Sequence, residues 1–192
     1  AIIVTLVINL VYPINIKKSI LCYTDKVDAL IKDEVTLLAS YLRDAVDQNA
    51  YYLKHQENEV IVQNILKQAE LVDKDILFAK DHLHMSYIMM RYEQLNRLSR
   101  LFDLTKGLRV QHLHALVLSD YIDGLSQDIG HQDKATIQLE KLKQLLNTYK
   151  TKPLPKTRVE FEVRATLYQM IFEIEAFLEA KIAFHARYKD FE

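Results

Sequence analysis

The chain has 192 residues, of which 49% are hydrophobic and 27% charged, with three glycines, three prolines and one cysteine. So few glycines and prolines argue against a sheet protein with many turns, and a formal net charge of −1 offers no field that would attract nucleic acid. The single cysteine, Cys22, cannot form an internal disulfide, which fits a reducing compartment.

The first twelve residues, AIIVTLVINLVY, carry no charge and are followed by Pro13 and then by Lys17 and Lys18. As a helix they would span roughly 18 Å, against a hydrocarbon core of about 30 Å. Positive charge directly after an apolar run is typical of the cytoplasmic end of a membrane helix. We therefore interpret residues 1–13 as the truncated end of a transmembrane helix and residues 14–192 as a cytosolic helical-bundle domain. The alternative is a short buried segment of a soluble domain.

A long helix is predicted over residues 14–53, which contain no glycine or proline. Its apolar residues recur at steps of three and four and form one wide face toward a core. Glu34 is the one charged residue in that pattern. The apolar members are Ile16, Ile20, Tyr23, Val27, Leu30, Ile31, Val35, Leu37, Leu38, Tyr41, Leu42 and Ala45. We expect this helix to couple the membrane to the bundle, or else to be simply its longest helix.

Four further helices are predicted over about residues 57–79, 81–106, 110–129 and from 133 onward. Asp81 and Asp133 are candidate N-caps, and Gly107 and Gly130 stand where two of these helices should end. The residues expected to face the core are Val60, Ile61, Ile65, Ala69, Val72 and Ile76, then Leu83, Tyr87, Met90, Leu95, Leu98 and Phe102, and finally Ile137, Leu139, Leu142 and Leu146.

The last helix is predicted to follow the extended segment Lys152-Pro153-Leu154-Pro155. Thr157 and Glu160 have the spacing of a capping box, which indicates a helix running to about Tyr188. Its expected buried residues are Phe161, Tyr168, Ile171, Phe172, Leu178 and Ile182. The sequence therefore predicts an all-α bundle of five to six helices with long first and last helices.

Motifs for catalysis or metal binding are not recognisable. The chain lacks a Gly-x-Ser-x-Gly nucleophile turn, a Gly-rich phosphate loop and the Glu-x-x-His unit of di-iron bundles. The paired histidines His82/His84 and His112/His114 lie two residues apart and would point about 200° from each other on a helix. We therefore expect that the chain is not an enzyme and that it binds no cofactor and no metal ion.

The densest basic region holds Arg97, Arg100 and Arg109, with Tyr87 and Tyr92 nearby. These five residues are candidates for binding a small aromatic acid, and the arginines could also face anionic lipid headgroups. The structural alternative is that the arginines form salt bridges with acidic residues of neighbouring helices. Nucleic acid is not an expected partner, because the chain has no excess of positive charge.

Residues 153–167, PLPKTRVEFEVRATL, resemble the closing helix of the putative aromatic acid exporter C-terminal domain, which occurs in membrane proteins of Gram-positive bacteria. The family pattern is Pro-Leu-Pro-Lys-Thr-Arg, two acidic residues and Phe-Glu-Asn-Arg-Ala; here Val159 and Val163 replace the expected Glu and Asn. The start of the chain is similar to the point where the family's last membrane helix enters its cytoplasmic part. The structural residues that carry the match are Pro153, Pro155, Thr157, Glu160, Phe161 and Arg164.

The resemblance implies an integral membrane protein related to fusaric-acid and aromatic-acid exporters, with this chain on the cytoplasmic face of the bacterial cell membrane. No catalytic residue carries over. Our first hypothesis is an assembly or regulatory domain whose partners are its own N-terminal transmembrane domain and further copies of itself, joined through the apolar stripe of the first helix. The alternative is a soluble helical sensor or ligand-binding bundle for a small aromatic anion.

Overall fold

The computed structural model describes residues 13–44, 48–75, 82–106, 108, 113–130, 132–133, 135–189 and 191. The helices in these ranges are α2 (Pro13–Asp44), α3 (Gln48–Asp75), α4 (Leu83–Thr105), α5 (Leu113–Gln127), α6 (Thr136–Thr151) and α7 (Arg158–Arg187). The described residues contain no strand, so the all-α prediction is confirmed. The first and last of these helices, with 32 and 30 residues, are the longest.

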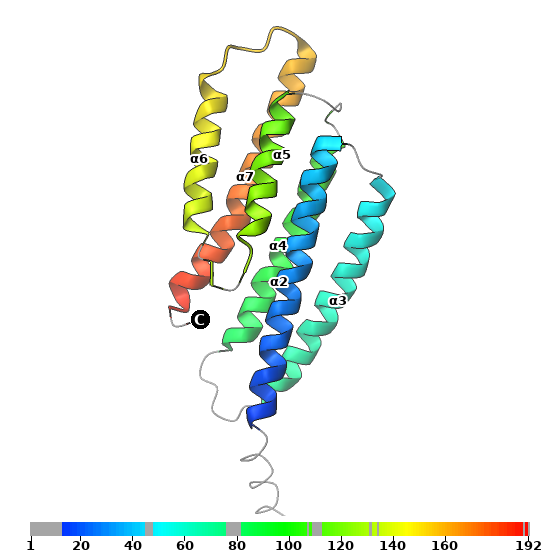
Figure 1. Cartoon of the computed structure of the whole chain (residues 1–192), viewed down its shortest axis with the longest axis vertical. Coiled ribbons are helices and arrows are strands. Elements are labelled where there is room, and N and C mark those ends of the chain that lie inside the picture. The colour runs from blue at the N-terminus through cyan, green and yellow to red at the C-terminus, as the bar shows by residue number, and fades with distance from the viewer. Residues whose placement is uncertain are drawn as a thin grey trace, which may run out of the picture.

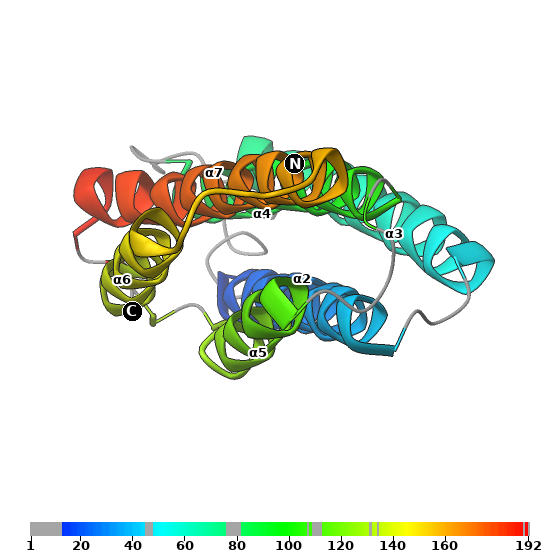
Figure 2. The same cartoon turned by 90° about the horizontal axis from the view of Figure 1, so that it is seen from above.

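The helices form two layers. In Figures 1 and 2, α7, α4 and α3 lie side by side in one layer, α2 and α5 form the other, and α6 lies at the edge against α7. α2 contacts α3, α4 and α5, while α4 contacts α2, α3 and α7. These two helices therefore occupy the middle of the bundle and connect its layers.

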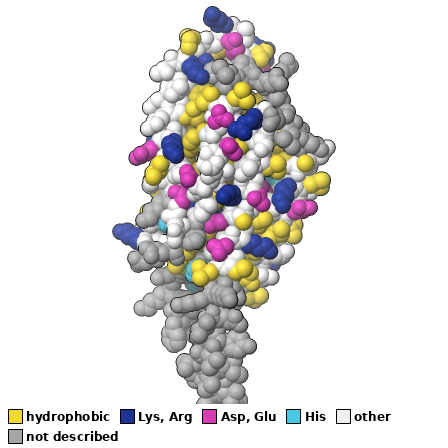
Figure 3. Space-filling model, viewed as in Figure 1, with side chains coloured by type: hydrophobic (Ala, Val, Ile, Leu, Met, Phe, Trp, Pro, Cys, Tyr) yellow, Lys and Arg dark blue, Asp and Glu magenta, His cyan; other side chains and the backbone are white. Residues whose placement is uncertain are grey.

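The core lies between the layers and follows the predicted face of α2. Val27, Ile31, Val35 and Leu38 are buried there, and Glu34 is buried among them. The described part of the stripe, from Tyr23 to Leu42, therefore packs inside the domain against α3, α4 and α5. On the surface face seen in Figure 3, acidic and basic side chains are interspersed with apolar ones.

The prediction of one helix over residues 14–53 is wrong. α2 ends at Asp44, and α3 begins at Gln48 and runs back along α2 in the opposite direction (Figure 1). Neither glycine nor proline marks this break, but Asp44, Asp47 and Asn49 lie around it. Asp and Asn side chains bond to nearby backbone and favour turns over helix interiors. A reversal there lets the apolar face of α3 pack on α2 and α4 instead of extending into water.

Four residues predicted to be buried are instead between 55% and 64% exposed: Val60, Ile137, Phe161 and Phe172. α3, α6 and α7 lie at the surface and bury only the side that faces their neighbouring helices, so the apolar band used for packing is narrower than predicted. Several other predicted core or cap residues lie outside the residues whose side chains are described: Ile16, Ile20, Ala45, Val72, Ile76, Asp81 and Gly107. The proposed transmembrane stump, residues 1–12, also lies outside the described residues, and none of the described helices is long and apolar enough to cross a membrane.

The predicted cap at Asp133 is displaced by two residues. Ala135 is the N-cap of α6, with a φ of 59° in the left-handed region. The Asp133 carboxylate accepts a hydrogen bond from the Ala135 N–H at 3.0 Å. Asp133 therefore stabilises the turn before the helix and does not cap the helix itself.

The predicted capping of the last helix is confirmed. The Glu160 N–H donates to Thr157 Oγ1 at 3.1 Å, and the Lys156 N–H donates to the Glu160 carboxylate at 2.7 Å. Pro153 and Pro155 lie in the non-helical segment before it, and Arg164 is half-buried on the second turn. This local geometry sets where α7 begins.

Replacing Thr157 with alanine removes the acceptor of the Glu160 N–H. We expect Thr157→Ala to lower the free energy of unfolding by about 1 kcal/mol, measured by urea denaturation. Thr148→Ala is the matched control, because the Thr148 hydroxyl only bonds back to the Gln144 carbonyl within α6. Its effect should be near zero or slightly stabilising, since alanine favours a helix interior. Equal losses in the two variants would contradict the capping role.

Candidate functional site

The interior of the bundle contains two clusters of charged and polar side chains, both anchored on α2. The first, here called the Arg91 cluster, consists of Asp28, Tyr87, Arg91, Gln94, Asp133 and Lys181. The second, here called the Glu34 cluster, consists of Glu34, Tyr51, His55 and Asn58. Because burying a charge without partners is costly, the partners of each group determine what these clusters do.

Arg91 lies on α4 and is fully buried. Its Nε is 2.7 Å from Oδ1 of Asp28 on α2. Its Nη2 donates to the Tyr87 hydroxyl at 2.8 Å, and its Nη1 donates to the Gln94 side-chain oxygen at 2.8 Å. Tyr87 in turn donates to the same Asp28 oxygen at 2.6 Å. The Asp28 carboxylate therefore holds α2 to α4 through a cation and a hydroxyl.

The Arg91 cluster also reaches α7 and the connection between α5 and α6. Gln94 donates to the Phe177 carbonyl of α7 at 2.7 Å, and Arg91 donates to the Gly130 carbonyl at 3.3 Å. Lys181 of α7 donates to that carbonyl as well and lies 3.3 Å from the Asp133 carboxylate. Burial, and then the nearby Arg91 charge, lower the pKa of Lys181 to about 8. Two buried cations thus share one backbone carbonyl between them.

The Glu34 cluster joins α2 to α3. Glu34 is 0% exposed, and its carboxylate accepts from Asn58 at 3.0 Å and lies 3.0 Å from His55 Nδ1. Tyr51 donates to Glu34 at 3.5 Å and to the Leu98 carbonyl of α4 at 3.3 Å. The hydrogen bond to Glu34 raises the pKa of His55, although burial works against this. A buried carboxylate is thus surrounded by donors from a single neighbouring helix.

Two of the arginines proposed as ligand-binding residues form ion pairs with acidic side chains. Arg97 is 2.8 Å from Glu93 and 3.5 Å from Glu173, and Arg100 is 3.3 Å from the same Glu173. These contacts are those of the structural alternative, salt bridges to a neighbouring helix. Arg109 lies outside the described residues.

The two candidate tyrosines are separated by the structure. Tyr87 is buried in the Arg91 cluster, where burial raises its pKa above the usual range. The Tyr92 hydroxyl contacts Gln63 at 3.2 Å and Glu59 at 3.4 Å on α3. Tyr92 lines a surface groove between α4 and α7, whose lining includes none of Tyr87, Arg97 and Arg100. Ligand binding by these residues stays a prediction.

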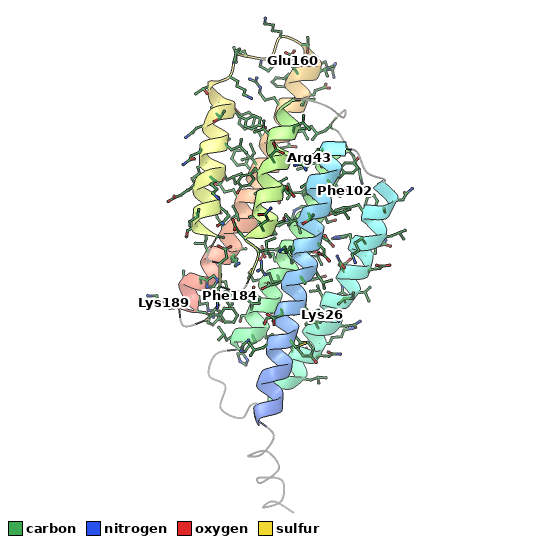
Figure 4. The ribbon with its side chains drawn as sticks, in the orientation of Figure 1. Lys26, Arg43, Phe102, Glu160, Phe184 and Lys189 are labelled. Atoms are coloured by element: carbon green, nitrogen blue, oxygen red, sulfur yellow. The ribbon has the colours of Figure 1, made fainter. Side chains whose placement is uncertain are left out.

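That groove, here called the α4–α7 groove, has a volume of about 590 Å³. It runs between the first half of α4 and the end of α7, near Phe184 in Figure 4. The side chains that line it are Ser86, Met89, Met90, Tyr92, Glu93 and Asn96 from α4, and Ala180, Ala183, Phe184, Arg187 and Tyr188 from α7 and its end. Sequence reasoning missed Arg187 and Met89, because nothing in the local pattern places the end of α7 against α4.

Metal ligation finds no support in the part of the chain that the structure describes. Nowhere in those ranges do three His, Cys, Asp or Glu side chains gather as a metal ion would require. The described residues therefore offer two buried polar clusters and one amphipathic groove as functional candidates.

The pH dependence of stability tests the Glu34 cluster. Because the pKa of His55 is higher in the folded chain, its protonation stabilises the fold fully below about pH 6.5, and this contribution is lost as the pH rises through the folded-state value. We expect the free energy of unfolding of the wild type, minus that of His55→Gln, to fall as the pH rises from about 6 to 8. Titrations common to both proteins cancel in this difference. The control is the same His55→Gln difference measured in a Glu34→Gln background, where the partner of His55 is no longer a carboxylate. An equal pH dependence there would contradict the assignment.

Breaking the Asp28–Arg91 pair tests the Arg91 cluster. Asp28→Leu leaves the buried guanidinium without its carboxylate, and we expect it to cost about 3–5 kcal/mol of unfolding free energy. The double variant Asp28→Leu/Arg91→Met should recover a large part of that loss, because no charge stays buried unpaired. The matched control is Asp120→Leu, which breaks an exposed pair with Arg43 and should cost less than about 1 kcal/mol. Similar losses for both single variants in urea denaturation would refute the role of burial.

Comparisons with known proteins agree with this fold. The chain is 27% identical over 125 residues to the uncharacterized protein YqjA of Bacillus subtilis (strain 168), an alignment that covers 64% of this chain and 39% of YqjA. The crystal structure of a putative membrane protein from Clostridium difficile 630 has the same fold, with a TM-score of 0.75 and 20% identity, and the match covers 85% of this chain and 97% of that one. A family model described as the putative aromatic acid exporter C-terminal domain matches residues 17–182. Since that match spans most of the 192 residues, the chain belongs to the putative aromatic acid exporter C-terminal domain family.

Proposed function

We propose that this chain is the cytosolic assembly and regulatory domain of an integral membrane exporter-like protein that carries aromatic acids out of the cell. The chain belongs to a family whose description names an aromatic acid exporter, and this supports the proposal. The chain matches only 39% of the length of YqjA, which leaves room in such a protein for a separate membrane part. The domain would lie on the cytoplasmic face of the bacterial membrane, with its own transmembrane domain as its first partner.

The observation that carries the proposal is the position of α2. This helix begins at Pro13, directly after the apolar residues 1–12, and it contacts α3, α4 and α5. A helix that leaves the membrane and then forms the centre of the bundle would transmit any displacement of the membrane part to the whole domain.

The buried charges of α2 would hold this helix rigidly against α3 and α4. Asp28 is held by α4 and Glu34 by α3, through contacts of 2.6–3.0 Å to Arg91, Tyr87, His55 and Asn58. Sliding α2 past its neighbours would separate both carboxylates from their partners, which is costly in the interior. α2, α3 and α4 would therefore move as one body, and a regulatory signal would pass between that body and the membrane.

For self-association, apolar side chains outside the α2 stripe are the better candidates. The described residues of the apolar stripe of α2, from Tyr23 to Leu42, pack inside the domain, so they are not available to a second copy. Large apolar side chains are exposed elsewhere, among them Phe161 and Phe172 on α7. These two residues are eleven positions apart, three helical turns, and so lie on one face.

Labelling of Cys22 tests the proposed location. Cys22 is exposed on α2, nine residues after Pro13. In cells that express the complete natural gene, a membrane-impermeant maleimide should label Cys22 in inverted membrane vesicles but not in intact cells. The Cys22→Ser variant is the control, because only the signal that it removes belongs to this residue. Recovery of the labelled protein in the soluble fraction, or labelling from outside, would overturn the proposal.

A further inference from the structure

We infer that the α4–α7 groove is a binding site for a small monocarboxylate that carries an apolar body. This inference rests on the regulatory part of the function proposed above and names the chemistry that the domain would recognise. The volume of about 590 Å³ falls within the range of roughly 300–1,000 Å³ that is usual for ligand pockets.

The walls of the groove suit an apolar body. Met89 is 55% exposed on α4, although it is a large hydrophobic side chain, and Met90 and Phe184 line the groove beside it. Methionine is flexible and polarisable and makes favourable contacts with aromatic rings, so such walls can adapt to a ring or to a short alkyl chain. Ala180 and Ala183 on α7 keep the space between the two helices open.

The charge that remains uncompensated in the groove is positive. Glu93 and Arg187 are the charged residues in its lining. Glu93 is paired with Arg97 at 2.8 Å. The Arg187 guanidinium lies over the Tyr188 ring, 5.3 Å from its centroid, and no carboxylate of the described residues is within 4.0 Å of it. Arginine presents a planar fork of donors that matches the two oxygens of a carboxylate.

Two hydroxyl groups also line the groove. Ser86 Oγ and the Tyr188 hydroxyl are 2.9 Å apart and both residues line the groove. Either hydroxyl can donate to a carboxylate oxygen that Arg187 leaves free. The groove therefore combines an apolar wall with hydrogen-bond donors, which is the combination that an amphipathic anion requires.

The groove also borders the Arg91 cluster. Met90, Phe184 and Tyr87 pack together with Phe191 in one small apolar cluster. The Tyr87 and Phe184 rings are 5.2 Å apart, and the Tyr87 hydroxyl bonds to Asp28 of α2. A ligand against Met90 and Phe184 would thus touch the same residues that fix the tyrosine joining α4 to α2.

Methionine methyl signals provide a direct test on the 192-residue chain. The chain contains four methionines, Met85, Met89, Met90 and Met170, which are assigned by single Met→Leu variants. On titration with sodium benzoate or sodium octanoate to about 10 mM, above the millimolar affinity expected of a small ligand, the carbon-13 methyl signals of Met89 and Met90 should shift. Met170 is fully buried in the core and its signal should not move. Whichever of the two acids binds more tightly shows whether the preferred apolar body is aromatic or aliphatic.

Arg187→Gln should weaken the binding of either acid by about tenfold or more, because a charge-assisted contact is lost. Arg158→Gln is the matched control on the same helix, at an arginine that is paired with Glu162 far from the groove. Benzyl alcohol, which has no charge, should bind the wild type and Arg187→Gln equally. The inference is overturned if neither acid shifts Met89 and Met90, or if Arg187→Gln binds the acids as tightly as Arg158→Gln does. Either result would leave the membrane location, tested by Cys22, unaffected.

Discussion

The burial of two carboxylates on one helix is the constraint on which the arrangement of this bundle depends. Asp28 and Glu34 both point from α2 into the interior, where an ionised carboxylate is unstable unless donors or cations surround it. Arg91 and Tyr87 of α4 bind one oxygen of the Asp28 carboxylate, and His55 and Asn58 of α3 bind the two oxygens of the Glu34 carboxylate. An apolar core accepts many shifts of one helix along another, but these contacts exist in only one register. The charges therefore specify how α2, α3 and α4 fit together, whatever their net effect on stability.

The same reasoning explains the position of the connection between α5 and α6. Its Gly130 carbonyl accepts from both Arg91 and Lys181, and its Asp133 carboxylate compensates Lys181. A turn that would otherwise be a variable surface loop is thus attached to the interior of the bundle. Through Lys181 the attachment reaches α7, so the last helix is positioned by polar contacts as well as by the apolar residues of its inner face.

The sequence permits local features to be predicted better than distant pairings. The period of the apolar residues identified the core face of α2 and showed that Glu34 interrupts it, and the Thr157–Glu160 spacing located the start of α7. The partners of Glu34 could not be found in this way, since they depend on the reversal between Asp44 and Gln48, which no glycine or proline marks. The burial of Arg91 could have been predicted from the sequence, because Arg91 is four residues after Tyr87 and four before Leu95, on the buried face of α4. The place of Arg187 in the groove could not have been predicted, because it depends on the packing of α7 against α4.

These separate features meet at Tyr87. Its ring belongs to the apolar cluster behind the α4–α7 groove, and its hydroxyl belongs to the Arg91 cluster that holds α2. A displacement of the ring would strain the 2.6 Å hydrogen bond to Asp28, since the ring and the hydroxyl contact different neighbours. A change in the packing of Met90 or Phe184 would therefore act on the Tyr87 ring, whose hydroxyl bonds to the α2 carboxylate. Through Tyr87, the α4–α7 groove would thus be linked to α2, the helix that we propose to leave the membrane.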